Sequence, residues 1–218
     1  MNPQIDHFVW GVSDLEAGCA EIEALFGVAP EPGGAHPGLG TCNALLSFGP
    51  GLYFEIMAPQ DPAPGSIGER LARLDAPGLV TWVLRSDELN QVAALASADT
   101  ANVTPTGPVK TERLTPQGDR LSWELLFLTQ HKYDGLVPFF IDWQDTPHPS
   151  ATSPAGGAAT ALTIESPQAE RLNQLFADLA IDMTASAAAE AALSVQCETK
   201  AGSVALQSTP QSLSVLGF

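Results

Sequence analysis

The chain has 218 residues, of which 44% are hydrophobic, and its 25 acidic against 9 basic side chains give a formal net charge of −16. Such a surface repels nucleic acid and anionic membranes, which bind basic patches, so neither is expected as a partner. No stretch approaches the roughly 20 apolar residues that a membrane-spanning helix needs.

The expected compartment is the cytoplasm. The N-terminal residues show no basic segment followed by an apolar one, so no signal peptide is expected. The three cysteines are scattered along the chain and form neither a CxxC motif nor a disulfide framework, which suits a reducing compartment: Cys19, Cys42 and Cys197.

The first sixty residues predict a strand, a helix and a hairpin. Ile5–Val12 has the pattern of a strand, and residues 13–16 (SDLE) form a capping box that predicts a helix start at Ser13. Thr41–Phe48 and Leu52–Ala58 predict a hairpin closed by the turn at residues 49–51. Residues 30–40 are rich in glycine and are expected to form a loop.

The same layout returns twice. Leu79–Arg85, a helix over Asp87–Ser97 and a strand over Arg120–Leu128 form the second copy. A fainter third copy has a strand at Ala159–Glu165, a helix at Ala169–Ile181 and a hairpin within 194–207, with Ala185–Ala192 as a loop or weak helix. A repeat of this length predicts duplicated sheet-and-helix modules, not a solenoid. The expected divisions are a first module (1–60), a linker (61–77), a second module (78–130), a connecting strap (131–157) and a third module (158–218).

Two side chains of the first module combine polar chemistry with apolar surroundings. Alternation along the first strand places Ile5, His7 and Val9 on one face. Glu55 lies in an otherwise apolar strand, where a buried carboxylate needs a metal, a cation or a raised pKa. A core histidine bonded to a backbone carbonyl and a salt bridge from Glu55 to an arginine are the structural alternatives.

The glycine-rich segment at 31–40 contains His36, which titrates near neutral pH and is the best general acid or base on the chain. His36, Thr41 and Asn43 are expected to overhang a site and contact substrate, although His36 also fits a plain surface loop. Alternation turns Cys42 away from the face that carries Thr41 and Asn43, which argues against a cysteine nucleophile.

Aligning the second copy with the first places Thr81 opposite His7 and Glu124 opposite Glu55. Arg85 ends the strand of Thr81, where it could grip an anion or pair with an acidic neighbour. Trp123 falls on the face opposite Glu124, where a tryptophan is more often part of the core.

These residues together resemble the glyoxalase-like proteins of the vicinal oxygen chelate superfamily. The carrying segments are IDHFVWGVSDLE (5–16), GAHPGLGTCN (34–43), YFEI (53–56) and PFFIDWQDTPHPS (138–150). The resemblance implies an α+β fold of tandem βαβββ modules whose mixed sheet curls into a cup, here followed by a degenerate third βαββ module. It also implies that the last of these segments borders the cup, which adds three residues to the expected site: Asp142, Trp143 and His148.

In that superfamily a divalent metal is commonly held by a first-strand residue and a last-strand carboxylate of each module. His7 and Glu55 match one such pair, Glu124 matches half of the other, and Thr81 departs from the pattern because a hydroxyl is a poor ligand. The donor types suit Zn, Fe, Mn or Ni.

Two functions follow as expectations. The first is an enzyme acting on a small carbonyl or enolate substrate by metal-assisted lyase, isomerase or hydrolase chemistry, with His36 or Glu124 moving a proton. The substrate-contacting residues would be Thr41, Asn43, Thr81, Arg85, Asp142, Trp143 and His148. The second is a protein that binds a small molecule in the same cup without metal or catalysis. A homodimer is possible in either case.

Overall fold

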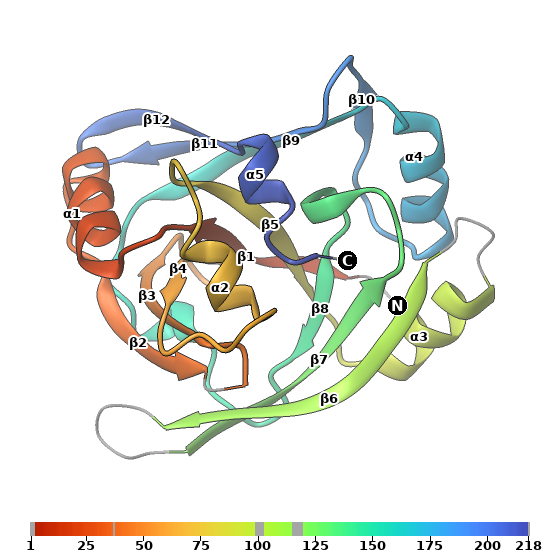
Figure 1. The fold of residues 1–218 in the computed structure, drawn as a ribbon, viewed down its shortest axis with the longest axis horizontal. Helices are drawn as coiled ribbons and strands as arrows, with labels where there is room; N and C mark the ends of the chain where they lie inside the picture. The colour runs from red at the N-terminus through yellow and green to blue at the C-terminus, as the bar shows by residue number, and fades with distance from the viewer. Residues whose placement is uncertain (1–2, 37, 99–102, 115–119, 218) are drawn as a thin grey trace.

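A computed structural model describes residues 3–36, 38–98, 103–114 and 120–217 of the chain (Figure 1). The elements within these ranges are, in order, β1 (Gln4–Gly11), α1 (Leu15–Phe26), β2 (Glu31–His36), β3 (Thr41–Ser47), β4 (Tyr53–Pro59), α2 (Ile67–Leu71), β5 (Gly78–Arg85), α3 (Leu89–Ala98), β6 (Thr104–Leu114), β7 (Arg120–Thr129), η1 (Asp134–Leu136), β8 (Phe139–Asp142), η2 (Pro149–Ala151), β9 (Ala158–Ser166), α4 (Ala169–Asp178), β10 (Ala185–Ala187), β11 (Ala192–Thr199), β12 (Gly202–Gln207) and α5 (Pro210–Leu213). No described helix is long and apolar enough to cross a membrane.

The main sheet has eight strands in the order β2-β3-β4-β1-β5-β8-β7-β6 and is strongly curled (Figure 1). β1 and β5 pair antiparallel at its middle, and each also pairs in parallel with the last strand of its own half, β4 or β8. Each half is therefore a βαβββ unit, which confirms the predicted α+β fold with a cupped mixed sheet.

The second half takes its last strand from the segment that the sequence predicted to be a connecting strap. β8 pairs with β5 on one side and with β7 on the other, so the predicted boundary at residue 130 leaves this strand out. The counterpart of β4 is therefore β8, and the sequence alignment of β7 with β4 was out by one strand.

Residues 31–36, expected to be a loop, form strand β2. β2 is the edge of the sheet, and its pairing with β3 shifts register between Pro32 and Gly34. An edge strand with a bulge tolerates proline and glycine. Proline has no backbone N–H to donate, which matters less on the unpaired side of an edge strand, and the extra residue of a bulge makes no hydrogen bond to the neighbouring strand. Their presence was therefore no bar to a strand.

Helix α1 starts one residue later than the capping box suggested. Asp14, not Ser13, is the N-cap, and its Oδ1 accepts from the backbone N–H of Ala17 at 2.8 Å. The helix ends at Gly27, whose φ of 71° is a left-handed cap that glycine adopts without strain. Ile22 and Phe26 of this helix are completely buried.

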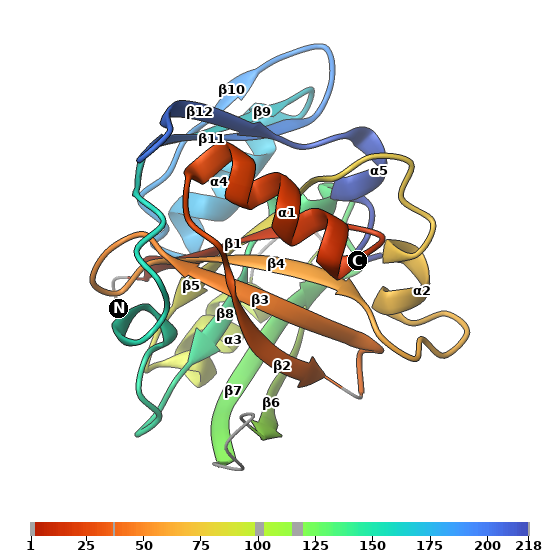
Figure 2. The same ribbon diagram turned by 90° about the vertical axis from the view of Figure 1, so that its left-hand side faces the viewer.

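The third unit forms a second sheet of four strands in the order β10-β9-β11-β12. The alanine-rich stretch expected to be a loop or weak helix instead contains β10, which pairs in parallel with β9. Helix α1 contacts β3 and β4 on one side and β12 on the other, so it lies between the two sheets (Figure 2).

Two cores occupy the two faces of the main sheet. Phe8, Trp82 and Phe176 belong to the larger core, which joins the convex face to the helices and the small sheet. Val9, Val83 and Trp123 belong to the smaller core on the concave face. The functional candidates lie with the second group.

Candidate functional site

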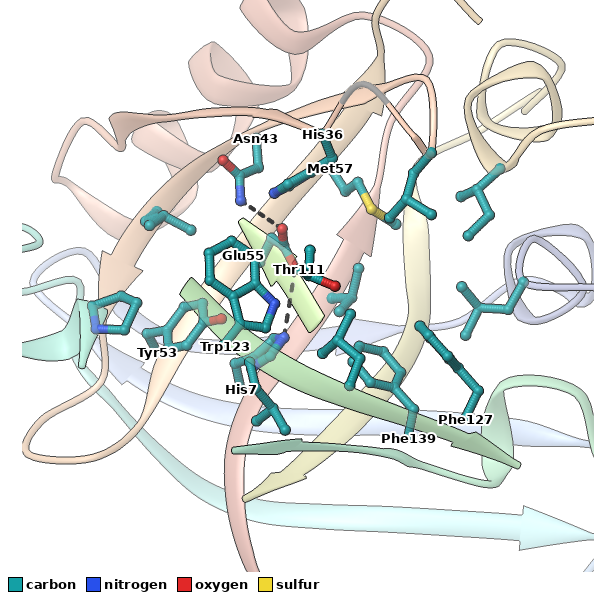
Figure 3. A pocket seen from close by; sticks show the side chains of 18 of the residues that line it. His7, His36, Asn43, Tyr53, Glu55, Met57, Thr111, Trp123, Phe127 and Phe139 are labelled. Atoms are coloured by element: carbon teal, nitrogen blue, oxygen red, sulfur yellow. Dashed lines mark hydrogen bonds and ion pairs between the residues drawn. The ribbon is translucent and has the colours of Figure 1, made fainter. Parts of the chain in front are cut away.

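A cavity opens on the concave face of the main sheet (Figure 3). β1, β3, β4, β7 and β8 supply most of its wall. The rest comes from β2, β6, α2, η2, the loops after β2 and β8, and the C-terminal segment. The lining residues are His7, Val9, His36, Leu39, Asn43, Leu45, Tyr53, Glu55, Met57, Ile67, Thr111, Trp123, Leu125, Phe127, Phe139, Ile141, Trp143, Pro149 and Leu216.

A bulge in β1 places Asp6 and His7 side by side. Ile5 pairs with Leu84 and His7 with Val83, so Asp6 is an extra residue that has no partner in the β1–β5 register. Such a bulge breaks the strict alternation of side chains between the two faces. The Nδ1–H of His7 consequently donates to Oδ1 of Asp6 at 2.7 Å, although the two residues are adjacent in sequence. The same bulge places Ile5 against the larger core, not on the His7 face as alternation predicted.

Asp6 is completely buried and accepts two more hydrogen bonds through Oδ2. The donors are Trp143 Nε1 at 3.1 Å and His148 Nε2 at 3.0 Å. Burial alone raises the pKa of Asp6, but the hydrogen bonds and charges of His148 and His7 outweigh burial and lower the pKa from 3.8 to about 2. Asp6 is therefore a carboxylate at neutral pH, and it keeps the Nδ1 proton on His7.

With Nδ1 held by Asp6, the Nε2 atom of His7 is directed into the cavity. It lies 3.6 Å from Oε2 of Glu55, whose other oxygen accepts from Asn43 Nδ2 at 2.6 Å. The His7 ring stacks on Tyr53 with the ring centroids 4.3 Å apart. Ring stacking and the Asp6 hydrogen bond together fix both the position and the tautomer of His7.

His36 and Asn43 lie across Glu55 from His7 (Figure 3). His36 ends the edge strand β2, and its Nδ1 is 3.1 Å from Thr41 Oγ1. Thr41 itself is buried and does not line the cavity, so it holds His36 and is not placed to touch a substrate. Cys42 packs against the larger core, on the side that alternation predicted.

The structure does not bring Glu124 to the cavity. Trp123 and Leu125 on either side of it line the wall, so alternation turns Glu124 to the other face, where Leu126 and Leu128 enter the larger core. Trp123 is buried in the smaller core, as predicted, and it also forms part of the cavity wall.

The second half of the sheet carries apolar residues at the positions that match His7 and Glu55. His7 pairs with Tyr53, two residues before Glu55, and Val83 pairs in the same way with Phe139, two residues before Ile141. Val83 and Ile141 are therefore the structural counterparts. Thr81, which the sequence alignment matched to His7, is fully buried outside the cavity lining, and its hydroxyl donates to the Trp82 carbonyl at 3.2 Å.

Arg85 and Asp142 do not line the cavity but lie at a neighbouring polar hollow, which shares Ile141 and Trp143 with it. Arg85 donates to the Gly51 carbonyl at 2.9 Å and to Gln4 Oε1 at 2.5 Å, and Asp142 accepts from Gln144 N–H at 2.8 Å. His148 contacts the site from behind, through Asp6, and its Nδ1 accepts from Ser150 N–H at 3.2 Å. Of Asp142, Trp143 and His148, Trp143 lines the cavity, and so do Phe139, Ile141 and Pro149 of the same segment.

The donor set does not fit a metal held by protein ligands alone. His7 Nε2 and Glu55 Oε2 converge, but a catalytic zinc site usually has three protein ligands. The described residues contain no group of three or more His, Cys, Asp or Glu side chains that could hold a metal ion. Val83 and Ile141 explain this result, because they stand where a second pair of ligands would be.

Sequence reasoning missed Asp6 and Leu216. Asp6 is a charged residue in an otherwise apolar strand, which is a signal, but alternation assigned it to the face away from His7. Leu216 follows the third unit and reaches the cavity because Arg70 binds the backbone around it, through Nη2 to the Leu216 carbonyl at 3.0 Å and through Nε to the Val215 carbonyl. No local pattern in the sequence predicts a contact over that separation.

Comparison with known proteins places this geometry in a family. A family described as glyoxalase-like domain matches residues 5–180. Among curated proteins, none matches significantly.

Solved structures share the fold at low sequence identity. A hypothetical protein from Staphylococcus aureus is 16% identical, with a TM-score of 0.63 over 95% of this chain and 85% of that one. A hypothetical protein from Bacillus halodurans is 12% identical, with a TM-score of 0.50 over 67% of this chain and 99% of that one. A Streptomyces coelicolor methylmalonyl-CoA epimerase variant is 18% identical, with a TM-score of 0.49 over 68% of this chain and 100% of that one. The family match covers most of the chain, so this protein belongs to the glyoxalase-like domain family.

Proposed function

We propose that this protein is an acid–base enzyme that moves a proton on a small carbonyl compound bound in the cavity. The observation that carries the proposal is the alignment of Asp6, His7 and Glu55, in which a buried carboxylate fixes one nitrogen of His7 and leaves the other facing the cavity. The same arrangement of an oriented histidine serves general acid–base catalysis in unrelated enzymes.

The chemistry follows from the positions of the groups. His7 Nε2 accepts the proton from the carbon beside the substrate carbonyl, and the electrons of the broken C–H bond form an enolate. Asp6 stabilises the imidazolium that results, since its carboxylate already bonds to Nδ1–H at 2.7 Å. His36 lies on the other side of Glu55 and supplies an N–H for the enolate oxygen. Return of the proton to carbon, or loss of a leaving group, completes an isomerase or a lyase reaction.

The apolar wall supports this chemistry. His7 is 3% exposed and Glu55 7% exposed, so a bound substrate would meet both with little competing water. Charge interactions are stronger in such surroundings than in water, which favours stabilisation of a developing oxyanion by fixed donors.

The test is exchange of the α-hydrogens of carbonyl compounds in D2O, followed by proton NMR over a panel of ketones, aldehydes and esters. Exchange by the native protein, lost at least about 100-fold in His7→Asn, is the expected result. Glu124→Gln is the control, since Glu124 faces away from the cavity, and it should keep the native rate. Equal losses in His7→Asn and Glu124→Gln would contradict the proposal.

A binding protein of the same fold is the second candidate. The observation that favours it is the apolar pair Val83 and Ile141 at the positions that match His7 and Glu55. Saturable binding of a panel compound without any α-hydrogen exchange would support this candidate over the enzyme.

A further inference from the structure

The cavity contains a carboxylate, and its described lining residues include no permanently charged cation. Its ionisable lining residues are His7, His36 and Glu55, and no lysine or arginine is among the described lining residues. Two arginines close to the lining in sequence or contact are engaged elsewhere: Arg70 binds the C-terminal segment and Arg85 binds Gly51 and Gln4.

An anionic group in this cavity would have to lose its water beside Glu55. A buried charge is tolerated when a partner of opposite sign or several hydrogen bonds replace the water. The Asn43 amide already donates to Glu55 at 2.6 Å, and the Nδ1–H of His7 is committed to Asp6. Glu55 and the buried Asp6 behind His7 both repel a carboxylate or a phosphate. The net charge of −16 adds to the same effect at long range.

Aromatic rings form the rest of the wall. Trp123 and Trp143 lie with ring centroids 5.4 Å apart, and Phe127 and Phe139 are 5.1 Å apart. Tyr53 contacts Trp143 edge to face at 6.3 Å and joins this belt to the stacked His7 ring. Rings at such spacings offer offset and edge contacts to a further aromatic group.

We infer that the substrate is an uncharged, largely aromatic carbonyl compound, and that the cavity rejects carboxylates and phosphates of the same shape. The inference rests on the proposed function only in placing the substrate in this cavity. The carbonyl end would lie among His7, Glu55 and His36, with the apolar body against the aromatic belt formed by Tyr53, Trp123, Phe127, Phe139 and Trp143.

The test compares two probes of nearly equal shape, 2-acetylnaphthalene and 2-naphthoate, by titration calorimetry with the full chain at pH 7.5. The ketone is expected to bind at least about tenfold more tightly than the carboxylate, because only the carboxylate must be desolvated beside Glu55. Naphthoate binding as tight as the ketone, or no ketone binding at millimolar concentration, would overturn the inference. The native protein alone decides this point, so it does not depend on any variant folding.

Variants then assign the discrimination to Glu55. Glu55→Gln should narrow the preference for the ketone at least about threefold, whereas Glu124→Gln should leave it unchanged. An unchanged preference in Glu55→Gln would contradict the role given to this carboxylate. The α-hydrogen exchange assay separates the two proposals: a ketone that binds without exchange refutes the enzyme and leaves the substrate class standing. Exchange on compounds that carry carboxylates would refute the substrate class and leave the proposed enzyme activity standing.

Discussion

Replacing Asp6 with asparagine tests the central geometry of the site. The substitution keeps the size of the side chain but removes the charge that accepts from His7, His148 and Trp143. An asparagine offers one acceptor oxygen, and its NH2 group must then face at least one of these donors.

The magnitude follows from the pKa. The fall of the Asp6 pKa from 3.8 to about 2 corresponds to roughly 2 kcal/mol of folding free energy, at about 1.4 kcal/mol per pH unit. One buried donor left without an acceptor adds about 1–3 kcal/mol. Asp6→Asn should therefore lower the free energy of unfolding by about 3–5 kcal/mol at pH 7.

The direction of the Asp6 pKa shift decides how the loss of stability in Asp6→Asn changes with pH. The folded-state pKa of Asp6 is below its unfolded value, so its stabilisation is fully present above about pH 4 and is lost as the pH falls through about 2. Urea unfolding followed by circular dichroism should show a difference between native protein and variant that is about 1 kcal/mol smaller at pH 3 than at pH 7.

The matched control is Asp145→Asn, which makes the same change on an exposed residue of the neighbouring segment and should alter stability by no more than about 0.5 kcal/mol. Two results would refute the reasoning: an Asp6→Asn protein within about 0.5 kcal/mol of native at pH 7, or a difference that is the same at pH 3.

Three further changes probe separate parts of the structure. Trp143→Phe keeps a ring but removes the N–H that donates to Asp6, so the free energy of unfolding from urea titration should fall by about 1 kcal/mol. An unchanged free energy of unfolding would mean that this hydrogen bond is not formed. Arg70→Met removes the donors to Val215 and Leu216 and should cost about 1–2 kcal/mol, with faster proteolysis of the C-terminal segment; Arg73→Met, which loses only an exposed ion pair to Glu69, is the control. Dialysis against a chelator should leave α-hydrogen exchange unchanged, because among the described residues only His7 and Glu55 converge as possible metal ligands. Stoichiometric metal found by elemental analysis in the native protein, and lost in His7→Ala, would contradict the conclusion that these two side chains are too few to hold a metal.

The sequence predicted the half of the site that depends on local periodicity. Alternation grouped His7 with Val9 and turned Asn43 away from the face of Cys42, and all three side chains so grouped line the cavity. The pairing of Glu55 with His7 came from the resemblance. The capping signals located the start of α1 to within a residue.

The remainder depends on features that periodicity does not record. A one-residue bulge moved Asp6 to the face of His7, and the parallel pairing of β8 with β5 replaced Glu124 by Ile141 as the counterpart of Glu55. His148 and Leu216 reach the site through contacts with Asp6 and Arg70 that join residues 142 and 146 positions apart. Such pairings are decided by the whole fold, and a short window of sequence carries no trace of them.

The position of Leu216 in the chain has a consequence for biosynthesis. Residues made at the start of translation, such as His7, meet a wall that is made more than 200 residues later. Until that segment has been synthesised and bound by Arg70, a growing chain carries an aromatic hollow with one side open. Nascent chains stalled before Leu216 would therefore expose the apolar wall of the cavity to solvent. Chaperones that bind exposed apolar surfaces should crosslink to such chains, and the crosslinks should disappear once Leu216 has emerged.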